Sequence, residues 1–243
     1  MTEPTCRRQS LPLDPFAVLS RAARMGRTLV GVRTPGALLE RIGLFEDIVE
    51  KDGLMIAENS SNCTEIDPAA ILSIVTDVSE TPHDTVLTYV DFLDAHGASV
   101  IKITALDGPD GFDAALQGLP RRPLPPALPL PRRTIAVDPA DVGGAPLVAA
   151  HASGQMVTLA VKRPGARQSW TGTLDAIRFG HSYVNVIQAD MHLHLAAGAV
   201  ALWRKQAGPG GAVTLVAENE AGQPIGLAIS GPGHAFEAMA ETV

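Results

Sequence analysis

The sequence predicts an α+β protein in which a unit made mostly of antiparallel β-strands occurs twice, with short flanking helices and a pseudo-two-fold relation between the copies. Three observations support this prediction: motifs that recur at a near-constant offset, a hydrophobic period that is mostly two residues, and a proline-rich stretch between the recurring segments. The chain has 243 residues, of which 46% are hydrophobic and 19% charged, so it can bury a large core.

The duplication is visible in motifs that match in the same order. Val32-Arg-Thr-Pro-Gly36 recurs as Val161-Lys-Arg-Pro-Gly165, an offset of 129 residues. Further matches at this offset join Gly43 to Gly172, Ile48 to Ile177, and residues 66–74 to residues 195–203. We therefore expect two copies over 28–117 and 155–240. The chain is therefore expected to consist of a first repeat with an N-terminal helix (1–119), a linker (120–133) and a second repeat (134–243).

Local signals predict the elements of each repeat. Asp14-Pro15, followed by FAVLSRAARM and Gly26, predicts a capped helix that ends at a glycine. Alternating side chains over 85–94, with turn signals at 34–36 and 51–53, predict a meander of five or six antiparallel strands closed by a short helix. Hairpin loops are expected at 95–97 and 208–211, and a short helix at 145–152.

The segment between the copies is rich in proline. Residues 120–133 (PRRPLPPALPLPRR) contain six prolines in fourteen residues, which favours an extended polyproline II spacer and excludes a helix. Within it, Arg122-Pro-Leu-Pro-Pro126 also matches the basic PxxP pattern of SH3-domain ligands. Of the two interpretations of residues 120–133, we favour a stiff linker over an SH3-domain ligand.

Charge and composition exclude several classes of function. The net charge is −7; residues 1–119 carry nine Lys and Arg against eighteen Asp and Glu, whereas residues 120–243 carry ten against eight. This balance argues against sequence-independent nucleic-acid binding but leaves room for a small anionic ligand on the second half.

No apolar run is long enough to span a bilayer and no secretory signal is evident, so we expect a cytoplasmic protein that is not embedded in a membrane. The GxSxG, P-loop and CxxC motifs are missing.

Several motifs resemble a known family. Arg24-Met-Gly-Arg27, residues 40–46 (ERIGLFE) and residues 89–97 (YVDFLDAHG) are similar to the first half of the HemS-like cytoplasmic haem-utilisation proteins, also called haemin-degrading factors. Residues 183–186 (YVNV) and 190–195 (DMHLHL) are similar to the second half, and residues 180–185 (GHSYVN) resemble the shorter ChuX/HutX-type haem carriers. The resemblance implies two large antiparallel sheets related by a pseudo-two-fold. It also implies haem binding and intracellular haem trafficking in bacterial haem-iron uptake, with an inner-membrane haem importer or a haem-accepting enzyme as candidate partners.

One departure from the family bears on catalysis. In the long members, a helical segment between the repeats supplies the histidine that ligates haem iron. Here a proline-rich segment replaces it, and no histidine lies between His96 and His151. We therefore expect a haem carrier with no catalytic residues and little haem breakdown. The alternatives are an active haem-degrading enzyme that releases iron and a degenerate member that acts as an interaction module.

Two histidines are the best candidates for contact with iron. His192 and His194 are two residues apart, so on a strand both side chains lie on one face. Imidazole suits haem iron and also zinc, copper and nickel. His194 is the preferred metal ligand because the resemblance to the short carriers implies a histidine at that position. The alternatives are a solvated polar strand face and a bare-metal site completed by Asp190, His181 or Glu218.

Other candidates surround these histidines in the sequence. His181 and Tyr183 flank a glycine-led turn, where tyrosine can ligate ferric haem and both side chains can bond a propionate. Arg178 and Arg204 are candidates for pairing with haem propionates, because arginine binds carboxylates through two parallel hydrogen bonds. The same repeat also offers the cations Lys162, Arg163, Arg167 and Lys205. Trp170 and Trp203 are read as core residues, and Cys63 as a structural position instead of an activated thiol.

Overall fold

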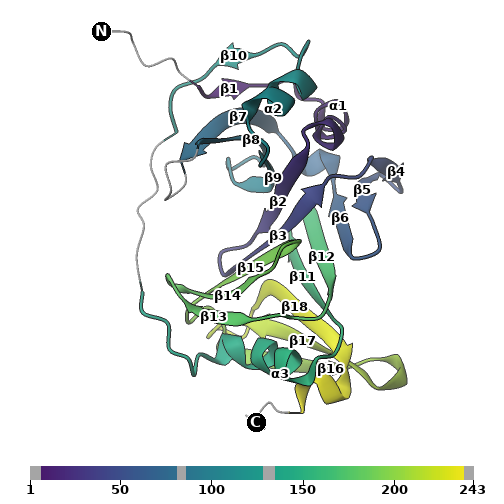
Figure 1. Ribbon diagram of the computed structural model, residues 1–243, viewed down its shortest axis with the longest axis vertical. Coiled ribbons are helices and arrows are strands. Elements are labelled where there is room, and N and C mark those ends of the chain that lie inside the picture. The colour runs from purple at the N-terminus through teal and green to yellow at the C-terminus, as the bar shows by residue number, and fades with distance from the viewer. Residues whose placement is uncertain (1–6, 81–85, 128–134, 238–243) are drawn as a thin grey trace.

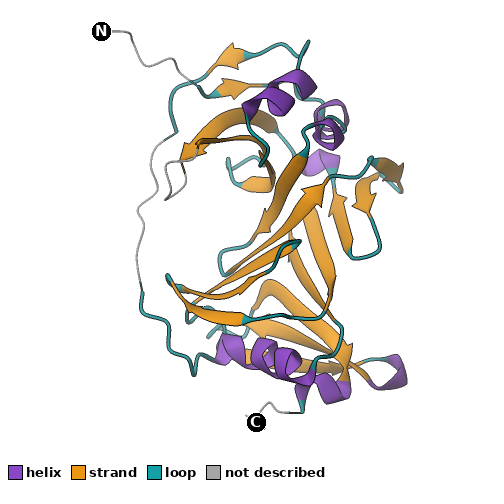
Figure 2. Cartoon of the chain, in the orientation of Figure 1, coloured by secondary structure: helices purple, strands orange, loops and turns teal. Residues whose placement is uncertain are grey.

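The computed structural model describes residues 7–80, 86–127 and 135–237, which form two large antiparallel sheets with short helices toward either end (Figures 1 and 2). This architecture confirms the predicted fold class. None of the helices in these ranges is long and apolar enough to cross a lipid bilayer.

Sheet A has ten strands and contains the candidate histidines. In spatial order its strands are β10 (Arg122–Pro123), β1 (Gln9–Ser10), β7 (Ser73–Glu80), β8 (Val86–Leu93), β9 (Ser99–Ala105), β2 (Arg27–Arg33), β3 (Ala37–Leu44), β15 (Met191–Ala196), β14 (Tyr183–Ile187) and β13 (Ile177–Gly180).

Sheet B has eight strands and packs against sheet A. Its strands are β16 (Leu202–Ala207), β17 (Ala212–Glu218), β18 (Pro224–Pro232), β11 (Val157–Arg163), β12 (Ala166–Gly172), β6 (Asn62–Ile66), β5 (Leu54–Glu58) and β4 (Val49–Lys51). The helices are α1 (Pro15–Leu19), α2 (Pro109–Ala115) and α3 (Ala145–Ser153), together with five 3-10 turns at Ala22–Arg24, Pro68–Ala70, Val142–Gly144, Pro209–Gly211 and Gly233–Phe236.

The duplication extends to the order of the elements. Strands β2 to β9 are matched in sequence order by β11 to β18, and α2 is matched by the 3-10 turn at 233–236. Strands β3, β5, β6 and β7 begin 129 residues before β12, β14, β15 and β16, as the motif offset predicts. Strands β8 and β9 begin 126 and 125 residues before β17 and β18, because small deletions shorten the second copy.

The pairing of strands differs from the predicted meander. Each copy contributes eight strands in the described residues, and each copy is divided between the sheets: five strands stay together and three join the sheet of the other copy. Thus β15, β14 and β13 extend sheet A from β3, while β6, β5 and β4 extend sheet B from β12. The expectation of one meander of five or six strands per copy is wrong, because a two-residue period indicates which side chains share a face but not which strand lies alongside.

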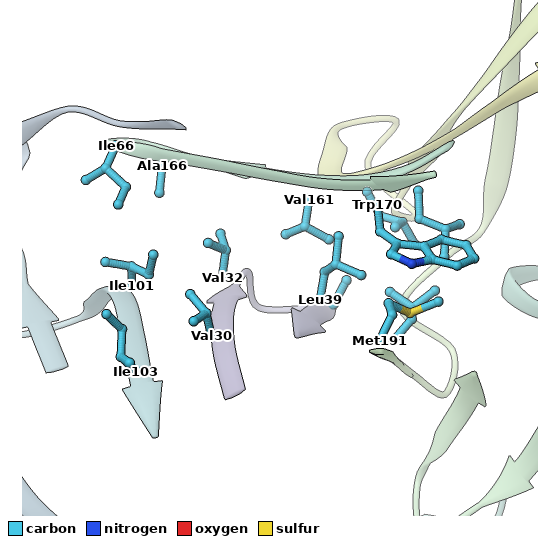
Figure 3. Packing of buried hydrophobic residues seen from close by; sticks show 14 of the residues in the cluster. Val30, Val32, Leu39, Ile66, Ile101, Ile103, Val161, Ala166, Trp170 and Met191 are labelled. Carbon is cyan, nitrogen blue, oxygen red and sulfur yellow. The ribbon is translucent and has the colours of Figure 1, made fainter. Parts of the chain in front are cut away.

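The core lies between the two sheets. Figure 3 shows Val30, Val32 and Leu39 of sheet A facing Val161 and Ala166 of sheet B. One polar side chain lies among these residues: Gln168 is fully buried and donates hydrogen bonds to the carbonyl oxygens of Val30 (2.9 Å) and Leu39 (2.8 Å). These two bonds join sheet B to sheet A, and Gln168 Oε1 accepts a bond from the buried hydroxyl of Thr64 on the neighbouring strand β6 (3.1 Å).

The predicted tryptophan positions are confirmed as core. Trp170 is 3% exposed and Trp203 is 8% exposed. Each indole nitrogen has a partner, because Trp170 donates to Asp190 Oδ2 (2.9 Å) and Trp203 donates to the carbonyl of Val142 (3.0 Å). Both rings therefore stabilise the sheets and are not free to stack on a ligand.

The N-terminal helix begins as predicted but ends early. Asp14 caps α1 by accepting a hydrogen bond from the amide of Ala17 (3.0 Å). The helix ends at Leu19, and a 3-10 turn continues toward Gly26. The hydroxyl of Ser20 donates to the carbonyl of Phe16 (2.7 Å), which is the local competition that weakens a helix at serine.

The proline-rich segment is described as far as residue 127. Within it, Arg122–Pro123 forms β10 and pairs with β1, so this part is extended. Residues 128–133 of the expected linker lie outside the described residues. The helix expected at 145–152 is confirmed as α3.

Candidate functional site

The strand exchange brings the candidate histidines beside the first repeat. On β15, His192 and His194 alternate with the buried residues Met191, Leu193 and Leu195, so both imidazoles lie on the face of sheet A that points away from the core. Pairing between β15 and β3 sets His192 opposite Glu40. Register partners share a face of the sheet, so a carboxylate from the first copy meets two imidazoles from the second.

The three side chains form a compact cluster. Glu40 Oε2 lies 3.5 Å from His194 Nε2 and 3.7 Å from His192 Nδ1. The side chains of both histidines are 25% exposed and that of Glu40 is 16% exposed, so the cluster is largely shielded from water. Burial by itself would raise the pKa of Glu40, but hydrogen bonds and charge from His192 and His194 lower it to about 2. Glu40 is therefore ionised at neutral pH.

Asn185 on β14 holds the ring of His194. Its Nδ2 donates to the carbonyl oxygens of Tyr183 (3.0 Å) and Gly180 (3.1 Å), which orients the amide. The amide oxygen Oδ1 therefore faces His194 Nδ1 at 2.7 Å. Because an amide oxygen only accepts, Nδ1 carries the hydrogen, and Nε2 of a neutral His194 keeps its lone pair.

His194 and Tyr183 border a cavity of about 540 Å³. The two rings meet edge to face, with centroids 5.9 Å apart and an interplanar angle of 74°. The cavity is also lined by Glu40, by Arg33 at the end of β2, and by the turn that joins β2 to β3, including Pro35. A histidine, a tyrosine, a carboxylate and an arginine thus converge on one hollow.

A second, larger cavity adjoins the first. It measures about 890 Å³ and shares Arg33, Thr34 and Pro35 with the smaller one. Its walls come from corresponding segments of the two copies: residues 33–35 and 162–165, where β2 and β11 end, and residues 98–99 and 224–226, where β9 and β18 begin. The lining is mostly proline, glycine, alanine and isoleucine, with Arg33, Lys162 and Arg163 as its cations. This size and composition are typical of pockets for small organic ligands.

The remaining predicted residues lie elsewhere. His181 occupies the turn between β13 and β14 with a positive φ of 52° and is exposed. Arg178 lies on the edge strand β13, opposite Asn185 in register, and is exposed. Arg204 lies on β16, the edge strand of sheet B, where it pairs with Glu218. The structure therefore brings His192, His194 and Tyr183 together, while Arg204 belongs to the other sheet.

The proposed completing ligands of a bare-metal site are also engaged elsewhere. Asp190 accepts the hydrogen bond of Trp170, and Glu218 pairs with Arg204. His151 on α3 has its Nδ1 2.7 Å from the carbonyl of Leu174, and it lines neither cavity.

Cys63 fits its interpretation as a structural position. Burial raises the pKa of its thiol, and Glu65 and Glu58 raise it further. A raised pKa means less thiolate at neutral pH, so the residue lacks the activation that a nucleophile needs.

Sequence reasoning missed Glu40 as a site residue. Glu40 occurs within the motif that carries the family resemblance, and it alternates with the buried Leu39 and Arg41 on β3. This pattern indicates the outward face of a strand. It contains no information that β3 pairs with β15, which is what makes the carboxylate part of the cluster.

Comparison with known proteins defines the class of fold. No family model matches the sequence, and no curated protein matches it. Solved structures, in contrast, share the fold over almost the whole chain. The similarity therefore lies in architecture far more than in sequence.

Two solved structures illustrate this similarity. ChuS of Escherichia coli O157:H7, described as a heme degrading enzyme, superposes with a TM-score of 0.77 at 15% identity over 93% of this chain and 82% of that one. Holo-PhuS of Pseudomonas aeruginosa, described as a heme-binding protein, superposes with a TM-score of 0.75 at 15% identity over 96% and 87%. The chain has the fold of these proteins, which confirms the fold implied by the resemblance.

Proposed function

We propose that this protein binds haem and carries it within the cell. The observation that carries the proposal is an oriented histidine that borders a cavity adjoining a larger one, in a fold shared with ChuS and PhuS. Haem is cargo in this proposal. An inner-membrane importer would supply it and a haem-accepting enzyme would receive it, with the exchange taking place in the cytoplasm.

His194 is the proposed iron ligand. Its Nδ1–H donates to Asn185, which fixes the ring and increases the basicity of Nε2 toward a metal. Nε2 is the atom by which histidine holds haem iron in many proteins. His192 is a weaker candidate because it does not line the cavity. Tyr183, whose ring lies beside His194, is the second choice for ferric iron.

The cations that border the cavities are proposed partners of the haem propionates. Arg33 borders both cavities and is exposed, and Lys162 borders the larger one. A guanidinium can pair with a carboxylate through two parallel hydrogen bonds. This assignment favours Arg33 over Arg178 and Arg204, which line neither cavity.

A haemin titration tests the function. The purified chain is expected to bind one haemin and shift its Soret band, and the shift should be altered in His194→Ala. His96→Ala is the matched control, because His96 is an exposed histidine in the turn between β8 and β9. If equimolar haemin retains the spectrum of free haemin, the haem-carrier proposal is wrong.

A further inference from the structure

We propose that Glu40, His192 and His194 form a binding site for a divalent transition-metal ion, distinct from the iron of haem. One ligand atom from each residue lies within 4.8 Å of the others. The residues come from two strands that belong to different repeats, so the site exists only because the strands are exchanged.

The geometry of the cluster places three potential ligand atoms close to one another. His194 Nδ1 bonds to Asn185, so Nε2 is the ring nitrogen that lies toward the carboxylate of Glu40, at 3.5 Å. His192 adds its Nδ1 at 3.7 Å from the same carboxylate oxygen. A bound metal ion satisfies all three groups at once.

The distances suit a small metal ion. Zinc bonds of about 2.0–2.1 Å in tetrahedral geometry separate neighbouring ligand atoms by roughly 3.3 Å. The two distances to Glu40 exceed this value by only a few tenths of an ångström. The imidazole nitrogens lie within 4.8 Å of each other, so the two rings must move slightly closer to bind one ion. Glu40 and His194 line the smaller cavity, which leaves room there for a water molecule or a further ligand.

The donor set selects the class of metal. Two imidazoles and one carboxylate suit zinc and its transition-metal neighbours, whereas calcium and magnesium prefer sites made wholly of oxygen. Asn185 supplies the outer-shell hydrogen bond that orients a metal-binding histidine. The cluster thus has both the ligands and the supporting bond of a metal site.

Zinc binding to the haem-free, full-length protein without a histidine tag tests the proposal. Titration of Zn²⁺ against a chromophoric chelator is expected to reveal one ion per chain. Glu40→Gln, His192→Ala and His194→Ala should each weaken binding by tenfold or more. Asn185→Ala should weaken it by about 10- to 100-fold, as losses of outer-shell bonds do.

Three matched controls separate this site from adventitious binding. His96→Ala removes an exposed imidazole, and Glu50→Gln removes an exposed carboxylate. Cys63→Ser removes the cysteine thiol found in the part of the chain that the structure describes. All three are expected to bind Zn²⁺ as the wild type does, and thermal melting verifies that each variant folds. The visible absorption of bound Co²⁺ should be lost in Glu40→Gln and retained in Glu50→Gln. Equal Zn²⁺ affinity in the wild type and all site variants, or no measurable binding to the wild type, would overturn the proposal.

A competition experiment extends the inference to regulation and rests on the proposed haem function. Metal and haem iron both need Nε2 of His194, so one equivalent of Zn²⁺ should weaken haemin binding to the wild type but not to Glu40→Gln. Haemin affinity that is insensitive to Zn²⁺ would contradict the shared ligand. If haemin does not bind at all, the haem-carrier proposal fails, while the titration without haem still decides the metal site.

Discussion

The hydrogen bond between Asn185 and His194 permits a quantitative test of which residue holds the iron. Asn185→Ala removes the oxygen that accepts the Nδ1–H of His194 at 2.7 Å. A bond between neutral groups contributes about 0.5–1.5 kcal/mol, and a charge-assisted one roughly twice as much. Iron at Nε2 withdraws electron density from the ring, so the bond is stronger in the complex than in the free protein. A difference of about 1.4 kcal/mol corresponds to a tenfold loss of haemin affinity.

A double-mutant cycle measures this difference. Haemin is titrated into the wild type, Asn185→Ala, His194→Ala and the double variant, and the Soret band is followed. Asn185→Ala should weaken binding about tenfold when His194 is present and have no effect when it is absent.

Asn185 also bonds the carbonyls of Gly180 and Tyr183, so the melting temperature of each variant must be recorded. Asn185→Asp is the matched control, because it loses the same donations but keeps an oxygen for His194; we expect it to bind haemin more tightly than Asn185→Ala does. If Asn185→Ala weakens haemin binding equally in both backgrounds, the coupling is zero and His194 is not the iron ligand.

The site and the fold lead to three further predictions. His194→Ala should perturb the haem spectrum more than His192→Ala; equal spectra for both variants and the wild type would move the ligand to Tyr183 or His181. Incubation of the haem complex with ascorbate and catalase should leave the Soret band largely intact, and a biliverdin-like product that forms despite catalase would favour the enzyme alternative. Gln168→Leu should lower stability by about 1–3 kcal/mol, because the hydroxyl of Thr64 then lacks its partner in the core. Adding Thr64→Val should recover part of that loss in chemical denaturation, and no recovery would show that the hydroxyl is not the cause.

The exchange of strands means that neither repeat contains the candidate site by itself. Glu40 and Arg33 come from the first copy, while His192, His194 and Tyr183 come from the second. The larger cavity is likewise lined by segments of both copies. The two halves of the duplication therefore build the candidate site jointly.

Local features of the structure were predictable from the sequence alone. The offset between Val32 and Val161 indicated the duplication, and the alternation at His192 and His194 placed both imidazoles on one strand face. Asp14 marked the start of α1. These predictions succeed because each depends on residues that are close in the chain or on copies of the same segment.

Only the tertiary structure decided which distant residues meet. Glu40 joins the histidines because β3 pairs with β15, and Arg204 is remote from them because β16 lies at the edge of the other sheet. The two-residue period is the same for every antiparallel strand, so it determines the face of a side chain but not the neighbour of its strand. The sequence therefore determined the repeated unit and the outward histidines, whereas packing between the two copies determined the cluster and the cavities.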